Sequence, residues 1–157
     1  MFKFVTVDTE IEIAIRHQAF EPEAGAGPHP AAMAVLFRAR AHGMEGAVST
    51  WVDAAEWAAF GARIEAFRRG ELGSLQLHAR TGEEVVVKLR KVDLDRVELC
   101  LELRPRDSLE EPFTNLLRVH VRPDAHTVTE FGAWVQKHAD PAYAVAPGGG
   151  EKAPTSP

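Results

Sequence analysis

Residues 116–124 read LLRVHVRPD, and the predicted fold rests on the pattern in this short stretch. Three polar side chains alternate there with three apolar ones, Arg118, His120 and Arg122 against Leu117, Val119 and Val121. Because successive side chains of a β-strand point to opposite faces of its sheet, the alternation predicts a strand with one buried and one exposed face. The polar triplet then lies on the exposed face.

The same two-residue period recurs upstream of this stretch. It is found in TEIEIAI (9–15), MAVLFRARAH (33–42), GAVSTWV (46–52), LGSLQLHAR (72–80), EEVVVKLRKV (83–92) and RVELCLELR (96–104). Short turns such as His42-Gly43 and Thr81-Gly82 separate consecutive runs. Strands joined by such turns pair in an antiparallel manner, so the sequence predicts two antiparallel groups of strands.

Two other segments have the periodicity of helices. Residues 54–69 follow Asp53, a residue suited to the N-cap, and end before Gly70, which suits a left-handed C-terminal position. Their large apolar side chains have the spacing of one helix face: Trp57, Phe60, Ile64 and Phe67. A second helix is expected from about Thr127, where TVTE forms a capping-box pattern, to near His138.

These elements predict an α+β fold in a single domain over residues 1–139. The expected architecture is a curved, mostly antiparallel sheet of about seven or eight strands, with one helix between the two strand groups and one C-terminal helix. Residues 21–30, EPEAGAGPHP, predict a loop. Residues 140–157 are dense in Pro and Gly and poor in large apolar side chains, which predicts a disordered tail.

The charge and cysteine content of the chain limit the binding partners and the cellular compartment that we expect for it. The net charge of −5, with no block of Lys and Arg, argues against nucleic acid. Cys100 is the single cysteine of the chain, which fits a reducing cytoplasm. The N-terminal stretch MFKFVTVDTE lacks the long apolar run of a signal peptide or membrane span, so no membrane association is expected.

No motif of catalysis or metal binding stands out. Cys100 lies inside a strand pattern and no G-x-S-x-G turn occurs, so neither a cysteine nor a serine nucleophile is indicated. The seven histidines are scattered without the spacing of zinc ligands, and the GGG at 148–150 opens no helix that could bind phosphate. We therefore expect a protein that is not an enzyme and holds no metal or cofactor.

The Arg118, His120 and Arg122 triplet has two interpretations. It could pair across strands with acids such as Glu98 or Glu102, as opposite charges do on exposed sheet faces. It could instead form a binding surface, because Arg38 with Arg40, and Lys88 with Arg90, repeat the arrangement elsewhere. Trp51 and Trp57 leave a similar choice between core packing and an aromatic pocket.

Two segments support a family resemblance: GAVSTWVDAAEWAAFGARIEAFRRGELGSLQL (46–77) and NLLRVHVRPDAHTVTEFGAWV (115–135). In order and spacing, the chain over residues 33–137 resembles the small bacterial proteins of the WapI-type immunity family and related families of unknown function. The resemblance implies a cytoplasmic protein that binds and blocks a toxin domain, often a nuclease. It brings no catalytic motif and hence no functional residues.

On this hypothesis an acidic edge forms the partner-binding surface, because acidic surfaces attract basic nucleases. The candidate residues are Asp93, Asp95, Asp107, Glu110 and Glu111, with the Arg118, His120 and Arg122 face as second choice. The alternatives are a small-ligand module with an apolar pocket between sheet and helix, near Trp57, Phe60 and Phe67, or a homo-oligomeric scaffold. An exposed edge strand would permit a homodimer.

Overall fold

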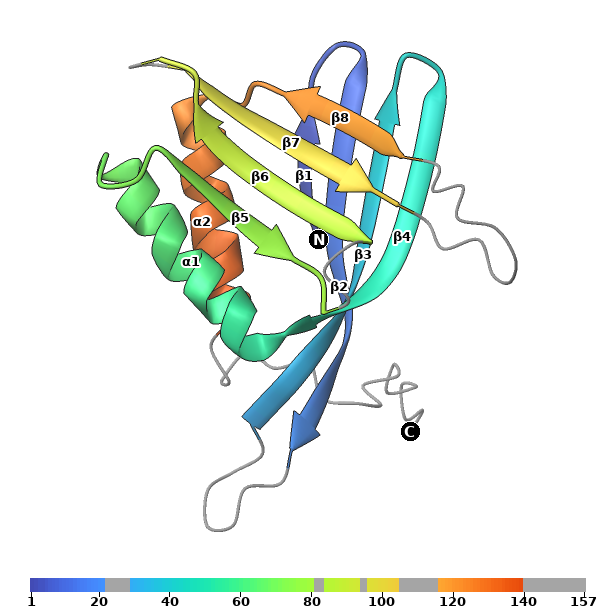
Figure 1. Cartoon of the computed structure of the whole chain (residues 1–157), viewed down its shortest axis with the longest axis vertical. Coiled ribbons are helices and arrows are strands. Elements are labelled where there is room, and N and C mark those ends of the chain that lie inside the picture. The colour runs from blue at the N-terminus through green and yellow to red at the C-terminus, as the bar shows by residue number, and fades with distance from the viewer. Residues whose placement is uncertain (22–28, 81–83, 94–95, 105–115, 140–157) are drawn as a thin grey trace, which may run out of the picture.

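The computed structural model describes residues 1–21, 29–80, 84–93, 96–104 and 116–139. The described residues form eight strands and two helices (Figure 1). They are β1 (Phe2–Val5), β2 (Thr9–Glu21), β3 (His29–Ala41), β4 (Met44–Asp53), α1 (Ala54–Arg68), β5 (Ser74–His78), β6 (Val85–Lys91), β7 (Val97–Leu103), β8 (Leu117–Val121) and α2 (Ala125–Ala139). The predicted α+β class, with one helix between two antiparallel strand groups and one C-terminal helix, is confirmed.

The strands divide into two four-stranded antiparallel sheets, which we call sheet A (β1-β2-β3-β4) and sheet B (β5-β6-β7-β8). Each sheet is a meander, because every strand pairs with the next one in the sequence. The predicted turn at His42-Gly43 joins β3 to β4, with φ of 49° and 80°. A two-residue hairpin turn with both φ values positive matches the twist of its strands, and Gly43 adopts that conformation without strain.

Residues 116–124 occupy the place that their alternation predicts. In β8, Leu117, Val119 and Val121 pair with Leu103, Leu101 and Leu99 of β7. Val119 and Val121 are each only 3% exposed, so this face of the strand belongs to the core. Arg118 and His120 point to the other side of sheet B, toward solvent.

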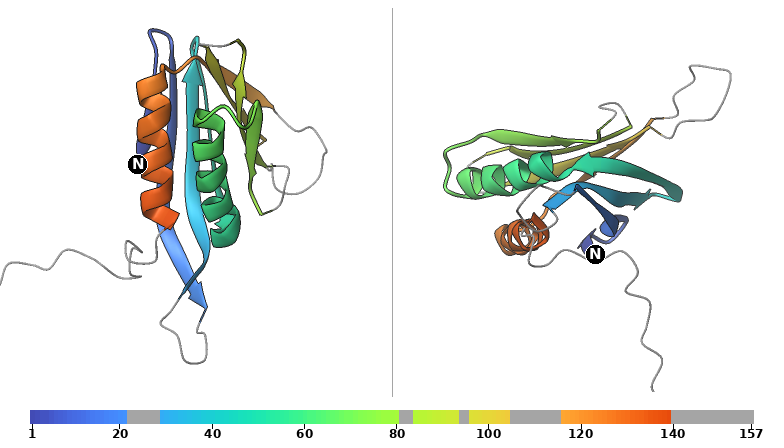
Figure 2. Two further views of the ribbon diagram at one scale, coloured as in Figure 1. Left: turned by 90° about the vertical axis from the view of Figure 1, so that its left-hand side faces the viewer. Right: turned by 90° about the horizontal axis from the view of Figure 1, so that it is seen from below.

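The two sheets face each other and the two helices lie at one side of them (Figure 2). Large side chains from all these layers fill the space between, with Phe37, Trp57, Phe60, Phe131 and Leu89 each at most 1% exposed. The Trp57 Nε1–H donates to the Val135 carbonyl of α2 at 3.0 Å, so the polar atom of this buried indole is satisfied. The space near Trp57 and Phe60 is a filled core, which argues against the predicted apolar ligand pocket.

The two helices approach closely at two glycines. A Cβ on Gly61 of α1 would lie 3.3 Å from Val135 Cγ1, and a Cβ on Gly132 of α2 would lie 2.9 Å from Ile64 Cγ2. Close helix contacts need such small residues, since even one methyl group would push the backbones apart. This close contact at Gly61 and Gly132, which we call the helix crossing, therefore fixes the position of α2 against α1.

Both predicted helix caps differ in detail from the structure. Helix α2 begins at Ala125, two residues before Thr127, because the Asp124 carboxylate accepts the Thr127 N–H at 2.7 Å. Asp53 precedes α1 but its side chain makes no capping hydrogen bond, and it pairs with Arg80 at 3.0 Å instead. Gly70, with φ of 83°, ends the helix region as predicted.

The predicted tail, residues 140–157, lies wholly outside the described residues. The predicted loop, residues 21–30, lies mostly outside them, at 22–28, whereas Glu21 belongs to strand β2 and His29 to strand β3. Within the described ranges, neither helix has the length and apolar character needed to cross a membrane.

The helix crossing gives a stability prediction. We expect Gly132→Ala to lower the free energy of unfolding by about 1–2 kcal/mol, because the clash with fully buried Ile64 outweighs the gain of about 1 kcal/mol in helix propensity. Urea denaturation measures the change. Gly73→Ala is the matched control, since its Cβ would meet no atom within 4 Å. Equal stability of the two variants would contradict the tight crossing.

Candidate functional site

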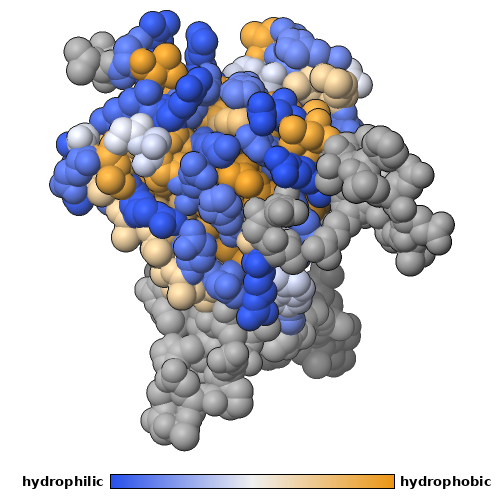
Figure 3. All heavy atoms as spheres, in the orientation of Figure 1, coloured by the Kyte–Doolittle hydropathy of each residue, from blue (hydrophilic) through white to orange (hydrophobic). Residues whose placement is uncertain are grey.

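Arg118 and His120 of the predicted triplet lie on the outer face of sheet B, which faces the viewer in Figure 1. Arg122 is exposed but follows the end of β8, and it lines a pocket with β1 and the start of α2. Strand alternation and register add side chains from the neighbouring strands to this face, so that it includes Lys88, Arg90, Glu98, Cys100, Glu102 and Arg104. Figure 3, in the same orientation, shows hydrophilic side chains gathered over the sheet with smaller apolar areas among them. We call this surface the basic face.

Glu102, in the central strand β7, is the first of two carboxylates in the floor of this face. It is 6% exposed and lies 3.1 Å from Lys88 Nζ, 3.2 Å from Arg118 Nε and 3.9 Å from Arg104 Nη2. Burial alone would raise the pKa of this carboxyl, but Lys88, Arg118 and Arg104 together hold it below its ordinary value. Glu102 is therefore ionised and surrounded by three cations.

Glu98 is the second carboxylate and has its own partners. Arg90 Nε donates to Glu98 Oε1 at 2.7 Å, and His120 Nδ1 lies 3.3 Å from the same oxygen. The Arg90 hydrogen bond lowers the pKa of Glu98; burial opposes this effect and the contact with His120 adds to it. The predicted cross-strand pairing is thus confirmed for two members of the triplet, Arg118 with Glu102 and His120 with Glu98.

The basic face presents more positive than negative charge to solvent. Among its described side chains, four are cationic, Lys88, Arg90, Arg104 and Arg118, and two are carboxylates. The carboxylates of Glu98 and Glu102 are only 8% and 6% exposed, whereas the side chains of Arg90 and Arg118 are 61% and 50% exposed. Acids form the floor and cations stand above them, so an approaching ligand meets positive charge.

The structure brings Cys100, His120 and Glu98 into a row that sequence spacing did not reveal. Cys100 Sγ lies 3.7 Å from His120 Nε2, while His120 Nδ1 faces Glu98. This resembles a nucleophile, base and orienting acid. Burial, however, raises the pKa of the Cys100 thiol, and Glu102 raises it further. A thiol held protonated inside a regular strand is a poor nucleophile, so the row serves packing and hydrogen bonding.

The predicted acidic edge has a different setting. Asp93 lies in the turn after β6 and accepts the Arg96 N–H at 2.9 Å, which is ordinary turn chemistry. It lines a shallow pocket with Phe67, Arg68 and Lys91, away from the basic face. The other four acids of this predicted surface, Asp95, Asp107, Glu110 and Glu111, lie outside the described residues. Their role as a binding edge stays a prediction.

Arg38 and Arg40 do not join the basic face. They lie on the outer face of sheet A, where the β2–β3 register sets them opposite Glu12 and Glu10. Arg38 also lies 3.9 Å from Glu45. Charges alternate on that face, so the repeated Arg pattern in the sequence corresponds to two separate surfaces.

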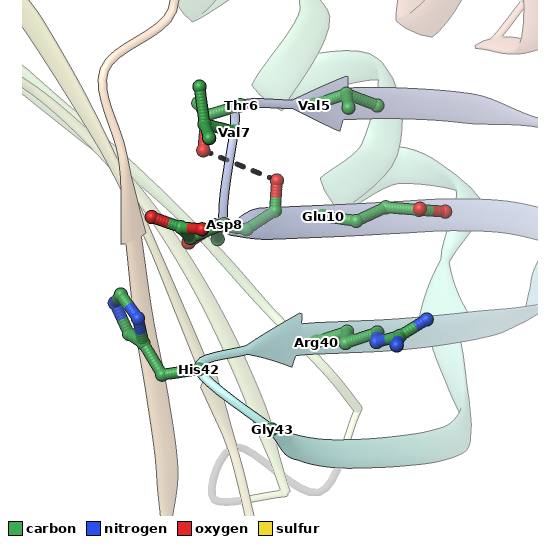
Figure 4. A pocket seen from close by; sticks show the side chains of 9 residues that line it. Val5, Thr6, Val7, Asp8, Glu10, Arg40, His42 and Gly43 are labelled. Carbon is green, nitrogen blue, oxygen red and sulfur yellow. Dashed lines mark hydrogen bonds between the residues drawn. The ribbon is translucent and has the colours of Figure 1, made fainter.

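A second pocket lies between the tips of the β1–β2 and β3–β4 hairpins (Figure 4). Its polar groups are engaged in the turns: the Thr6 N–H donates to the Thr9 carbonyl at 2.8 Å and the His42 N–H to the Asp8 carbonyl at 3.3 Å. The pocket is open and follows from the meeting of two turns. Across the described ranges, no three His, Cys, Asp or Glu side chains gather into a group suited to a metal ion.

One member of the basic face, Arg104, was missed by sequence analysis. It follows the last residue of β7 and keeps the parity of Glu98, Cys100 and Glu102, which places it on the same face. The two-residue period of VELCLELR could have identified it.

Comparison with known proteins finds likeness in fold. No family model matches the chain, and no curated protein matches it. The solved structure of the plant transcriptional regulator PBF-2 matches with a TM-score of 0.51 at 10% identity, over 88% of this chain and 79% of that one. The structure of WHY1 from Arabidopsis thaliana matches with a TM-score of 0.50 at 8% identity, over 87% of this chain and 86% of that one.

These findings correct the predicted function. The fold is shared with a plant transcriptional regulator, and no model of an immunity family matches, so the prediction of a WapI-type immunity protein that blocks a toxin domain was wrong. The alternative of a small-ligand or homo-oligomeric scaffold is not supported either. The exclusion of nucleic acid was also wrong. It used the net charge and the lack of a run of Lys and Arg along the sequence, whereas the cations of the basic face come from separate strands.

The ion pair of Glu98 gives a pH-dependent prediction. We expect Glu98→Gln to lower the free energy of unfolding by about 1 kcal/mol near neutral pH. Because the pKa of Glu98 is lowered in the folded state, its stabilisation is complete above the ordinary value of 4.5 and is lost as pH falls through the folded value. Denaturation curves of both proteins should converge in acid. A constant difference at every pH would contradict a charge effect.

Cys100 gives a second prediction. Because its pKa is raised and its side chain is buried, we expect alkylation by iodoacetamide to be slower in the folded protein than in denaturant by on the order of tenfold or more. Mass spectrometry follows the reaction. Fast alkylation of the folded protein, as in an activated thiol, would restore the possibility of nucleophilic chemistry.

Proposed function

We propose that this protein binds single-stranded nucleic acid on the basic face and acts in gene regulation. The observation that carries the proposal is the exposure of four cations, Lys88, Arg90, Arg104 and Arg118, above two buried carboxylates. Phosphate groups dominate the affinity of nucleic-acid binding and are bound by exposed Arg and Lys side chains. The fold shared with a plant transcriptional regulator supports the same class of function.

The shape of the surface favours a single strand over a duplex. Four adjacent strands span about 14 Å across the sheet, whereas the major groove is about 12 Å wide and admits a helix or a two-stranded ribbon. Helix α1 exposes alanines, Ala55, Ala58, Ala59 and Ala62, and offers no basic recognition surface. A flexible strand, by contrast, can cross a broad sheet and follow its cations.

The role that we propose is binding without catalysis. The Cys100, His120 and Glu98 row has a protonated thiol, which is a poor nucleophile. We also propose that the protein works in the reducing cytoplasm. The buried free thiol of Cys100 supports this location, since it needs no oxidising environment.

The test is the affinity for a labelled single strand of about 20 nucleotides, measured by fluorescence anisotropy. We expect the double variant Arg118→Ala/Arg122→Ala to weaken binding by about tenfold. It removes two phosphate contacts, one at Arg118 on the basic face and one at exposed Arg122, just beyond the end of β8. Arg68→Ala/Arg69→Ala is the matched control. It removes the same charge from the end of α1, where both arginines pair with nearby acids, and should bind like the wild type.

Salt dependence gives an independent readout of the same contacts. Each phosphate contact to a single strand contributes about 0.7 to the slope of log affinity against log salt, so the Arg118 and Arg122 variant should lose about 1.4. The same slope for both double variants would mean that the basic face does not contact phosphate. Absence of binding at low salt, or equal affinity for a duplex of the same sequence, would overturn the proposal.

A further inference from the structure

Trp51 is an exposed aromatic residue that neither the core nor the basic face uses. The chain has three tryptophans. Trp57 is completely buried, and Trp134 packs among Phe2, Trp57 and Phe131. Trp51 is 41% exposed on the outer face of sheet A. An indole held on a strand with this exposure has ring surface available to a ligand.

The ring of Trp51 is held by a second aromatic side chain. In the register of sheet A, His17, Ala34 and Trp51 form one row across β2, β3 and β4. The His17 and Trp51 rings meet edge to face, with centroids 6.2 Å apart and planes at 85°. Because Ala34 between them has only a methyl group, the two rings contact each other across it.

A β-bulge explains why His17 lies on this face. The pairing shifts between Ile15, which pairs with Val35, and His17, which pairs with Ala34. Without this shift His17 would share the core face of Ile11 and Ile13. The extra residue is exposed Arg16, so the bulge turns His17 outward and adds a cation nearby.

Arg80 joins this aromatic pair to the basic face. Its N–H donates to the Trp51 carbonyl at 2.7 Å, and its Nε lies 3.0 Å from Asp53, two residues after Trp51 on the same side of β4. His78, two residues before Arg80, is on the outer side of sheet B. The Arg80 and Asp53 pair is half exposed, so a phosphate can compete for the guanidinium at little cost.

From this arrangement we infer that Trp51, supported by His17, stacks with one unpaired base of a strand that reaches it from the basic face past Arg80. The inference rests on the proposed function and adds that the protein contacts a base of the strand as well as its phosphates. Stacking on an aromatic ring accepts any base, because every base has a π face. Bases within a duplex are already stacked, so this site selects single strands.

The experiment compares Trp51→Leu with the wild type on a single strand of mixed sequence. Leucine keeps the apolar bulk and removes the ring, so we expect affinity to fall by about five- to a hundredfold, with an unchanged salt slope. Trp51→Phe keeps a smaller aromatic ring, so its affinity should lie between those of the wild type and Trp51→Leu. Met44→Ala, which changes an exposed apolar side chain at the other end of β4, should leave affinity unchanged.

Two further measurements separate stacking from a structural effect. An abasic strand keeps its phosphates but has no bases, so wild type and Trp51→Leu should bind it equally. The base-containing strand should also quench the tryptophan fluorescence of the wild type and leave that of Trp51→Leu, which retains Trp57 and Trp134, nearly unchanged. Unfolding curves check that each variant is folded.

The outcomes distinguish this inference from the proposed function. If the strand binds the wild type, and Arg118→Ala/Arg122→Ala weakens binding while Trp51→Leu does not, the stacking site is refuted and the basic face stands. Equal losses on abasic and base-containing strands would also refute stacking. If the wild type binds no single strand at low salt, both proposals fail.

Discussion

The burial of every second side chain along the strands is the constraint on which the rest of the structure depends. Val119 and Val121 of β8 face Leu101 and Leu99 of β7, and these side chains are at most 3% exposed. Burying such a side chain contributes about 1.5–3 kcal/mol, so the sum over eight strands fixes the register. A slip by one residue would bring Glu98 and Glu102 into the core, where unpaired carboxylates are costly.

The same constraint creates the basic face. Strand β7 lies between β6 and β8, so its outward side chains, Glu98 and Glu102, are shielded by neighbours on both sides. Shielded carboxylates need partners, and the flanking strands supply Lys88, Arg90 and Arg118. Each of these long side chains satisfies a carboxylate below and keeps exposed surface above. Stability therefore dictates where the cations lie, and the proposed ligand would bind to the surface that they leave exposed.

Periodicity predicted the elements of the fold because it records burial directly. LLRVHVRPD, the meander strands and the stripe of Trp57, Phe60, Ile64 and Phe67 all occupy the expected faces. The division into two sheets was not predictable, since it depends on how α1 separates β4 from β5 in space. The outward turn of His17 was hidden as well, because a bulge changes the parity of a strand without a clear trace in the sequence.

The site was less accessible to sequence analysis than the fold. Cross-strand partners of Arg118 and His120 could be named from parity alone, and Glu98 and Glu102 proved to be correct. Cys100 and His120 are twenty positions apart, so their contact required the pairing of β7 with β8. The first interpretation of surface charge failed for a different reason: it looked for basic residues that are adjacent in the sequence, whereas those of the basic face are brought together by strand pairing.

Distance and screening reconcile a net charge of −5 with the proposed binding of phosphate on one face. The Debye length at physiological salt is about 8 Å, while packed sheets lie about 10 Å apart. Acids on the far side of the molecule are thus largely screened from a strand that lies on sheet B. Under the proposed function the strand meets Lys88, Arg90, Arg104 and Arg118 at contact. The acidic remainder repels phosphate at longer range, more strongly at low salt, and so favours approach from the side of the basic face.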